Sequence, residues 1–411
     1  MKGVPPYDWQ MLDNEPHTNA IPTRVAPVEP TDESVRLPTA RPTRQDVVRW
    51  IEGLASILER SSLALSWPSL FGKVVDEGAF RTLVDTVKKE SAELDDAEAL
   101  KKWPRSVYRL TSFLREVDGH SHCCEPRRTV VTTALDMGDT VAPAESSGES
   151  QSAEAFLIEH NGMRLWRVPV PEIVAPTESE SRAYQERVHE QIKRGEEFQV
   201  DGFVIDLRGN RGGSMWPMYH GILSLVGTGD VGAFFFLEKS NENTARLHTV
   251  SIDGTDYQLV RESFDAISSA YYRDRPNLIP GNLLDPPVAV WVDGDTGSAG
   301  EITSLILRGR PNTTIIGVPT AGMSTCNTTL RIPRDLHPLV SSQGTGGPIT
   351  IPEPEPWDVD VHITSGVCAD RHNQGSVRPL AVDHVVGDPS NAASWIEVTV
   401  RCLEALREVA A

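Results

Sequence analysis

Four short apolar runs between residues 200 and 320 constrain the fold more than any other feature of the chain. They cover residues 203–205, 233–237, 288–292 and 313–318, and stretches with helical periodicity lie between several of them. Runs of this length are typical of strands buried inside a sheet, and their alternation with helices is typical of an α/β architecture. The sequence therefore predicts an α/β core.

A hairpin and a helix are expected before the first of these runs. Residues 156–160 and 163–168 flank Asn161-Gly162, the dipeptide that best supplies the two positive φ angles of a type I′ turn. Tyr184, Val188 and Ile192 then follow at helical spacing.

Helical periodicity dominates the chain before residue 118. Thr43 resembles a helix N-cap, and apolar residues recur after it at helical spacing in three groups. The groups are Val47, Ile51, Leu54 and Leu58; Phe80, Leu83, Val84 and Val87; and Val107, Leu110, Leu114 and Val117. This pattern predicts a small helical bundle over residues 43–117, followed by a second domain over residues 118–411.

Two segments lack the apolar content of a folded domain. Residues 1–42 contain eight prolines, which favours an extended arm. Residues 142–154 are small, polar and acidic, which favours a mobile loop inside the second domain.

The composition excludes several classes of partner. A formal charge of -19 repels nucleic acid and anionic membranes. No stretch of about 18 uncharged apolar residues is present, as a membrane-spanning helix would require. Residues 1–42 contain no apolar run of the signal-peptide type, and the five cysteines form no CxxC pair. We therefore expect a cytoplasmic protein with reduced thiols.

Ser298 is the candidate nucleophile. The apolar run 288–292 breaks into a small-residue turn, and Ser298 follows at the start of a helical pattern. Unpaired backbone N–H groups and the helix dipole at such a position stabilise an oxyanion. Taken alone, a serine there is more often a plain helix N-cap. Position 296 is threonine, so the GxSxG spacing of the α/β-hydrolases is absent.

A glycine pair provides the second candidate feature. Gly212 and Gly213 end the segment 206–213, which follows the buried run 203–205. Without a Cβ, the backbone can approach a ligand there and direct an N–H at an oxyanion, although a plain tight turn is an equal interpretation. Phosphate binding is disfavoured because neither GxGxxG nor GxxxxGK[ST] is present.

The two segments together resemble peptidase family S41, the C-terminal-processing and tricorn-like serine peptidases. The motifs are Asp206-Leu-Arg-Gly-Asn-Arg-Gly-Gly213 and Asp295-Thr-Gly-Ser-Ala-Gly-Glu301, with further matches over residues 315–322 and 118–121. The resemblance spans roughly residues 118–400 and implies a ClpP/crotonase-like β-α core with serine peptidase chemistry. It also implies that the amides of Ala299 and of Gly212 or Gly213 form the oxyanion hole.

The resemblance directs the search for a general base to His120. In the processing-peptidase branch a lysine stands 25 positions after the serine, where this chain has Met323, and a glutamine follows where it has Asn327. A methionine cannot accept a hydroxyl proton, so a Ser-Lys dyad is excluded. The tricorn-like and nisin-resistance-like branch instead uses a histidine in an Asp-x-His segment, which matches Asp118-Gly-His120 and leaves His122 as the main confounder.

The third group, which would orient the imidazole, is not fixed by the sequence. Asp118 is too near in the chain to assume, and Asp370 and His372 lie near the segment where the tricorn-like branch carries a glutamate. Asn327 is a further candidate. Glu301 is expected to form a capping box with Ser298, or otherwise to face the substrate.

A metal site and a tethering domain are both disfavoured. Residues 120–124 include four soft or borderline ligands, but neighbours on a short strand point to opposite faces, so we expect neither metal nor cofactor. Only about 35 residues separate His120 from the hairpin, too few for the PDZ domain that is common in processing peptidases.

The leading hypothesis is a serine peptidase that cleaves a peptide or protein substrate through an acyl-enzyme, with Ser298 attacking and His120 moving the proton. The alternative is that the S41 scaffold serves as a peptide-binding protein, or as a non-hydrolytic protein that transfers or cyclises an acyl group. Met323 at the lysine position and the absent PDZ domain motivate this alternative.

Overall fold

A computed structural model describes most of the chain beyond residue 40. The described residues are 41–76, 78–124, 154–174, 176–227, 231–236, 247–264, 285–333, 336, 355 and 357–410. The predicted Pro-rich arm over residues 1–42 lies almost entirely outside them, as does the predicted loop over residues 142–154 apart from Glu154. The described residues from Pro42 onward belong to one compact unit.

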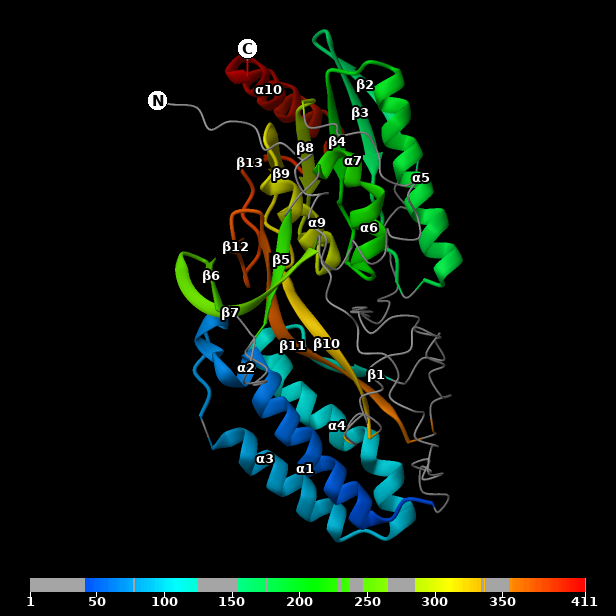
Figure 1. Ribbon diagram of the computed structural model, residues 1–411, viewed down its shortest axis with the longest axis vertical. Helices are drawn as coiled ribbons and strands as arrows, with labels where there is room; N and C mark the ends of the chain where they lie inside the picture. The colour runs from blue at the N-terminus through cyan, green and yellow to red at the C-terminus, as the bar shows by residue number, and fades with distance from the viewer. Residues whose placement is uncertain are drawn as a thin grey trace, which may run out of the picture. The chain divides into compact units, whose positions relative to one another are not determined.

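Helices occupy the first part of the described chain (Figure 1). They are α1 (Arg44–Ser61), α2 (Leu63–Ser66), the 3-10 helix η2 (Pro68–Phe71), α3 (Ala79–Ala92) and α4 (Asp96–Asp118). Thr43 caps α1 in a capping box with Asp46, as its position before the apolar pattern predicts. Gly119, with φ 73°, ends α4 in the left-handed conformation that glycine adopts without strain. The helix therefore ends where the helical pattern of the sequence stops.

The apolar faces of these helices pack together and onto strand β11 (Val359–Asp370). Residues at the predicted helical spacing in α1, α3 and α4 share one buried cluster with Val361 and Ile363 of β11. Trp50 and Trp103 add a tilted ring contact with 5.5 Å between centroids. The helical layer and the strand therefore share one hydrophobic core.

A six-stranded sheet contains the apolar runs around the candidate serine. Its order is β13 (His384–Val385), β9 (Thr313–Gly317), β8 (Val288–Val292), β4 (Gly202–Asp206), β3 (Met163–Pro169) and β2 (Phe156–His160). Strands β3, β4, β8, β9 and β13 pair in parallel, and β2 and β3 form the predicted antiparallel hairpin. Asn161 and Gly162 have the positive φ angles, 50° and 83°, that this turn requires.

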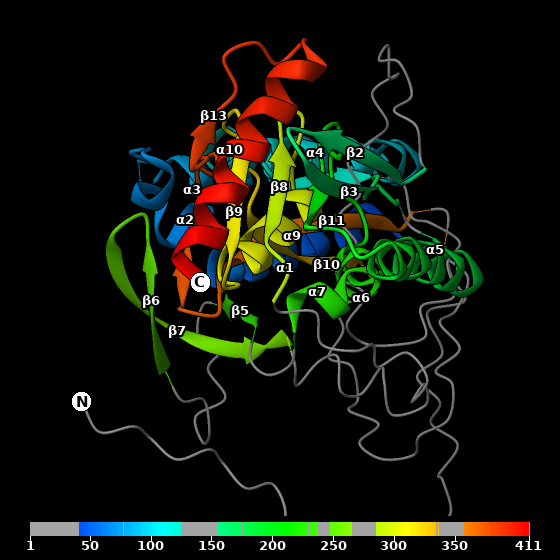
Figure 2. The same ribbon diagram turned by 90° about the horizontal axis from the view of Figure 1, so that it is seen from above.

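A seven-stranded sheet lies next to the helical layer and contains the remaining strands of the described residues (Figures 1 and 2). Beside β11 it contains β1 (His122–Cys124), β5 (Gly232–Phe236), β6 (Leu247–Ile252), β7 (Thr255–Ser263), β10 (Thr325–Ile332) and β12 (Gln374–Gly375). β11 pairs antiparallel with β1, β5, β10 and β12, and all of its 12 residues are buried. This strand organises the second sheet.

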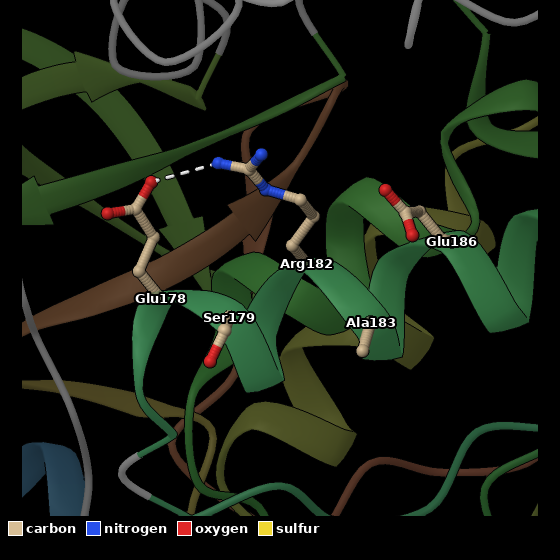
Figure 3. Close-up of a pocket in the computed structure, with 5 residues that line it drawn as sticks. All are labelled: Glu178, Ser179, Arg182, Ala183 and Glu186. Atoms are coloured by element: carbon tan, nitrogen blue, oxygen red, sulfur yellow. Dashed lines mark hydrogen bonds and ion pairs between the residues drawn. The ribbon is translucent and has the colours of Figure 1, made fainter.

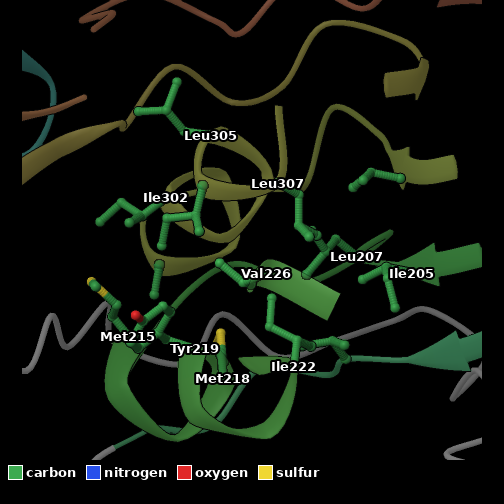
Figure 4. Packing of buried hydrophobic residues seen from close by; sticks show 14 of the residues in the cluster. Ile205, Leu207, Met215, Met218, Tyr219, Ile222, Val226, Ile302, Leu305 and Leu307 are labelled. Carbon is green, nitrogen blue, oxygen red and sulfur yellow. The ribbon is translucent and has the colours of Figure 1, made fainter. Parts of the chain in front are cut away.

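The other helices carry the serine and cover the six-stranded sheet. They are α5 (Glu178–Glu197), α6 (Met215–Gly221), α7 (Leu223–Val226), α9 (Ala299–Arg308) and α10 (Ala392–Ala410). α9 and α6 pack through side chains such as Ile302 and Met218, in a cluster that also contains Ile205 of β4 (Figure 4). The helix that starts at the candidate serine is thus fixed on a rigid core.

The protein is a mixed α/β protein with two sheets, in agreement with the predicted α/β class. Among the described residues, no helix is long and apolar enough to cross a membrane.

Candidate active site

Ser298 follows a turn that is held by side-chain hydrogen bonds. Asp293 accepts the N–H of Thr296 at 2.9 Å, and the Thr296 hydroxyl donates to the carbonyl of Leu207 on the neighbouring loop at 2.9 Å. Ser298 itself has φ 48° and ψ -119°, a conformation that residues other than glycine rarely adopt. Such strain costs about 1–3 kcal/mol and persists only where the surroundings enforce it. The turn therefore holds the serine at the first turn of α9 in one defined orientation.

The Gly212 loop lies directly beside this serine. A Cβ added to Gly212 would lie 2.6 Å from Ser298 Cβ. Asn210 joins the two segments, because its carbonyl accepts the N–H of Gly297 and its side chain donates to the carbonyl of Val170. Two motifs almost 90 residues apart in sequence thus meet at one point, as the interpretation of an oxyanion site requires.

The amides near the serine differ in what they bind. The N–H of Gly212 donates to Asn210 Oδ1 at 2.9 Å and is therefore already engaged. Within the described part of the chain, the N–H groups of Gly213 and Ala299 make no hydrogen bond to protein. Gly213 has no room for a side chain, because a Cβ would lie 2.2 Å from the carbonyl oxygen of Ile173.

The first half of the glycine motif is structural. The buried Asp206 carboxylate accepts two hydrogen bonds from the Arg208 guanidinium, at 2.7 and 2.8 Å, and it also pairs with Arg167 at 2.7 Å. The Arg208 guanidinium lies over the rings of both Trp291 and Trp395, 4.5 and 4.6 Å from their centroids, and these two rings contact each other. These contacts tie β4 to β8 and fix the origin of the Gly212 loop.

Glu301 connects the serine turn to the segment of residues 322–325. Its buried carboxylate accepts the N–H of Ser298 at 3.2 Å, which is the N-cap arrangement expected from the sequence. It also accepts the hydroxyl of Thr320 and the N–H groups of Gly322 and Met323. Burial raises the pKa of Glu301, and these four hydrogen bonds oppose that shift by stabilising the ionised carboxylate.

Met323 lies beside the serine turn. A Cβ on Gly297 would lie 2.7 Å from the Cε methyl of Met323. The residue at the expected lysine position thus contacts the turn through an apolar group, which cannot act as a base.

His120 contacts the same segment from the other side. In the turn after α4, Asp118 Oδ1 accepts the N–H groups of His120 and Ser121 at 2.9 and 2.8 Å. The buried His120 ring shares a hydrogen bond of 2.8 Å between its Nδ1 and Thr325 Oγ1. Thr325 follows Met323 by two residues, so the Ser298 turn and His120 are both anchored on residues 322–325.

Thr325 is a contact that sequence reasoning missed. A threonine at the start of a strand is common, and its pairing with His120 depends on the tertiary structure. The only signal in the sequence is its position two residues after Met323.

Two other predicted site residues, Asn327 and Asp370, form hydrogen bonds with groups other than the His120 ring. Asn327 Oδ1 accepts the hydroxyl of Thr364, which lies next to Ser121. Asp370 accepts the N–H groups of His372 and Gln374 and thereby closes the turn after β11.

The confounding histidine, His122, packs against β11. Its Nδ1–H donates to the carbonyl of His120 at 2.9 Å, and its ring stacks on that of His362 with 4.5 Å between centroids. It therefore belongs to the face formed by β1 and β11.

A pocket of about 510 Å³ lies away from these residues (Figure 3). Its lining comes from α5 alone: Glu178, Ser179, Arg182, Ala183 and Glu186. The residues that line this pocket include neither Ser298 nor His120. Across the described ranges, no group of three or more His, Cys, Asp or Glu side chains is arranged to hold a metal ion.

The chain is similar to known peptidases. Residues 173–343 match the sequence model of peptidase family S41. A nisin-resistance protein from Lactococcus lactis subsp. lactis is 31% identical over 130 residues, which cover 32% of this chain and 36% of that protein. The chain therefore spans about a third of the length of that curated relative.

A solved structure with a similar fold covers most of the chain. A lipoprotein from Streptococcus agalactiae aligns with a TM-score of 0.53 and 16% identity, covering 89% of this chain and 98% of that one. A photosystem II D1 C-terminal processing protease aligns with a TM-score of 0.43 and 13% identity, covering 86% of this chain and 96% of that one. The segment that matches peptidase family S41, residues 173–343, contains both the Gly212 loop and the Ser298 turn.

Proposed function

We propose that the protein is a serine peptidase in which Ser298 is the nucleophile and His120 the general base. One observation carries the proposal: the Ser298 turn and the His120 ring are anchored on the same four residues, 322–325. Glu301, on the helix of the serine, accepts the N–H groups of Gly322 and Met323, and His120 pairs with Thr325.

The hydrogen bond to Thr325 supports the role of His120. If Nδ1–H donates to Thr325 Oγ1, the lone pair on Nε2 is available to accept the Ser298 proton. Thr325 then acts as a positioning residue, which fixes the tautomer and the ring orientation as a carboxylate does in other nucleophile-base systems. Its hydroxyl is neutral, so it stabilises the imidazolium less than a carboxylate would.

The proposed chemistry proceeds through an acyl-enzyme. Ser298 Oγ attacks the scissile carbonyl while His120 takes its proton, and the N–H groups of Gly213 and Ala299 donate to the resulting oxyanion. The imidazolium then protonates the leaving amine, and water repeats the sequence to release the acyl group. One such donor typically lowers the barrier by about 3–4 kcal/mol. The same proposal assigns the fold a ClpP/crotonase-like core.

The burial of Ser298 determines how a substrate can reach it. Ser298 is fully buried, so a substrate must displace side chains to reach it. Met323 is suited to such a movement, because its unbranched side chain has several rotatable bonds and its Cε methyl abuts the serine turn.

A mass-spectrometric time course in H₂¹⁸O tests the proposal. A panel of peptides is incubated with the full chain, and it includes nisin because one relative is named a nisin-resistance protein. We expect product pairs that carry one added, ¹⁸O-labelled water, lost in Ser298→Ala and retained in Ser304→Ala. Ser304 is a matched control because it is a buried serine on the same helix whose hydroxyl donates to the carbonyl of Gly300.

The same experiment separates the alternative functions. Products that lack added water would contradict hydrolysis and indicate acyl transfer or cyclisation. Peptide binding without any product would contradict catalysis and indicate a peptide-binding protein. The cytoplasmic location stays a prediction, which cell fractionation can test, and one structural relative is described as a lipoprotein.

A further inference from the structure

A second candidate nucleophile, Cys124, lies on the strand that follows His120. His122 and Cys124 share one face of β1, and His122 is the register partner of His362 on β11. Cys123 lies between them and therefore faces the opposite side of the sheet, where it packs against the helical layer. The short strand thus places one thiol against the helices and the other beside a histidine.

The contacts of Cys124 form a nucleophile-base pair with an orienting hydroxyl. Cys124 Sγ lies 3.6 Å from His362 Nε2, and His362 Nδ1 lies 2.9 Å from Thr329 Oγ1. With the Nδ1 proton donated to Thr329, Nε2 can accept the thiol proton and leave a thiolate beside an imidazolium. The arrangement repeats that of His120 with Thr325, which is four residues earlier on β10.

Three titratable groups face this pair, and one of them, Asp360, is the register partner of Cys124 on β11. Asp360, the next residue of β11 on the same face, is paired with Arg331 of β10 by two hydrogen bonds of 2.7 and 2.9 Å. From β1, His122 stacks on His362, and its charge would oppose a second positive charge there. Asp118 at the end of α4 is hydrogen-bonded to the turn around His120. Arg331 thus offsets the charge of the Asp360 carboxylate opposite Cys124, and a His362 imidazolium would stabilise the thiolate directly.

The remaining cysteines provide internal controls. Burial raises the pKa of the Cys123 thiol, which keeps it protonated and unreactive at neutral pH. Cys326, Cys368 and Cys402 are buried, whereas Cys124 is only partly buried.

We propose that Cys124 is a reactive thiol that is modified by low-molecular-weight disulfides and other soft electrophiles. The Cys124 thiolate attacks one sulfur of a disulfide RSSR, a new S–S bond forms to Cys124, and the old S–S bond breaks. The thiolate RS⁻ leaves and takes the proton from the His362 imidazolium. The disulfide supplies the oxidising equivalents, so no other oxidant is required.

The modification would also affect the base. His122 Nδ1–H donates to the carbonyl of His120, so an adduct two residues further along the same three-residue strand would displace the His120 turn. This effect on His120 rests on the proposed function. We expect glutathione disulfide to lower peptide turnover at least tenfold, and a reductant to restore it.

Competitive labelling of the full chain with limiting iodoacetamide tests the thiol without reference to catalysis. At pH 6 an ordinary thiol with a pKa of about 8.5 is roughly 0.3% ionised, so a paired thiolate should react much faster. Peptide mapping should show Cys124 labelled at least tenfold faster than Cys123. Equal labelling of the two cysteines at pH 6 would overturn the proposal.

Two variants separate a reactive pair from mere exposure. His362→Gln and, more gently, Thr329→Val should each slow the labelling of Cys124 at pH 6 by threefold or more, and the effect should fade at pH 9. An unchanged rate in a folded Thr329→Val chain would contradict the pairing. If Cys124 is labelled selectively but its mixed disulfide leaves turnover unchanged, the link to His120 is wrong while the reactive thiol stands.

Discussion

The contact between Gly212 and Ser298 makes Gly212→Ala the sharpest test of the packing around the serine. An added Cβ would lie 2.6 Å from Ser298 Cβ, whereas carbon atoms pack at about 3.5 Å or more, so the two segments must separate by roughly 0.9 Å. The atom that it meets is next to the backbone and cannot rotate away. A displacement of about 1 Å at a reacting group typically costs ~100-fold in rate.

Gly209→Ala is the matched control from the same loop. Gly209 also has a positive φ, 71° against 110° for Gly212, but a Cβ there would meet nothing within 4 Å. The left-handed backbone conformation should cost an alanine about 1–2 kcal/mol in the free energy of unfolding. The hydrogen bond from the N–H of residue 209 to Asp293 is retained, so we expect turnover within threefold of wild type.

The assay is kcat/KM for peptide hydrolysis, measured on samples whose circular dichroism and melting temperature confirm folding. We expect Gly212→Ala to lose about 100-fold and Gly209→Ala to lose less than threefold. A folded Gly212→Ala chain that works as well as Gly209→Ala would refute the reasoning that this contact positions the serine.

Three further predictions concern the surroundings of the serine. Burial raises the folded-state pKa of Glu301 above its ordinary 4.5, so its contribution to stability is largest at low pH and falls as pH rises through the raised pKa. The melting temperature of wild type minus that of Glu301→Gln should therefore decrease between pH 4.5 and 7, and an increase would contradict the sign. Met323→Leu should keep turnover within about threefold, because the swap conserves volume and Met323 carries no proton; a 100-fold loss would show a chemical role. Arg208→Lys should lower the free energy of unfolding by about 1–3 kcal/mol in denaturant titration, because it loses the two-point contact with Asp206 and the contact with the Trp291 ring. Arg211 is partly exposed, so Arg211→Lys should change this free energy by less than ~0.5 kcal/mol.

Local features of the fold could be predicted from local sequence. The hairpin at Asn161-Gly162 and the end of α4 at Gly119 each follow from residues that fix the backbone within a few positions. The four apolar runs are confirmed as strands for the same reason, since each is short, continuous and buried.

Strand β11 was not predicted, although the whole of it is buried. It contains Asp360, His362 and Thr364 on one face, so its sequence lacks a continuous apolar run. These polar residues are buried because they lie opposite β1 and β10. The pairing with β1 depends on a register between segments more than 200 residues apart.

The candidate site was likewise predicted only in its local parts. The serine turn and the glycine loop could be identified from their motifs, but the links between the parts could not. Glu301 joins the turn to Gly322 and Met323, and Thr325 orients His120, only because distant segments meet in the folded chain. The engagement of the Gly212 N–H with Asn210 is likewise visible only in three dimensions.

Labelling with a fluorophosphonate probe tests the central claim most directly. Peptide mapping after a timed reaction gives both the site and the rate of labelling in wild type, Ser298→Ala, His120→Ala and the control Ser304→Ala. We expect an adduct on Ser298 in wild type and in Ser304→Ala, and none at that position in Ser298→Ala. General-base assistance contributes about 100- to 10,000-fold in rate, so labelling of His120→Ala should be at least 100-fold slower. Equal labelling of wild type and Ser298→Ala, or an unchanged rate in folded His120→Ala, would contradict the account.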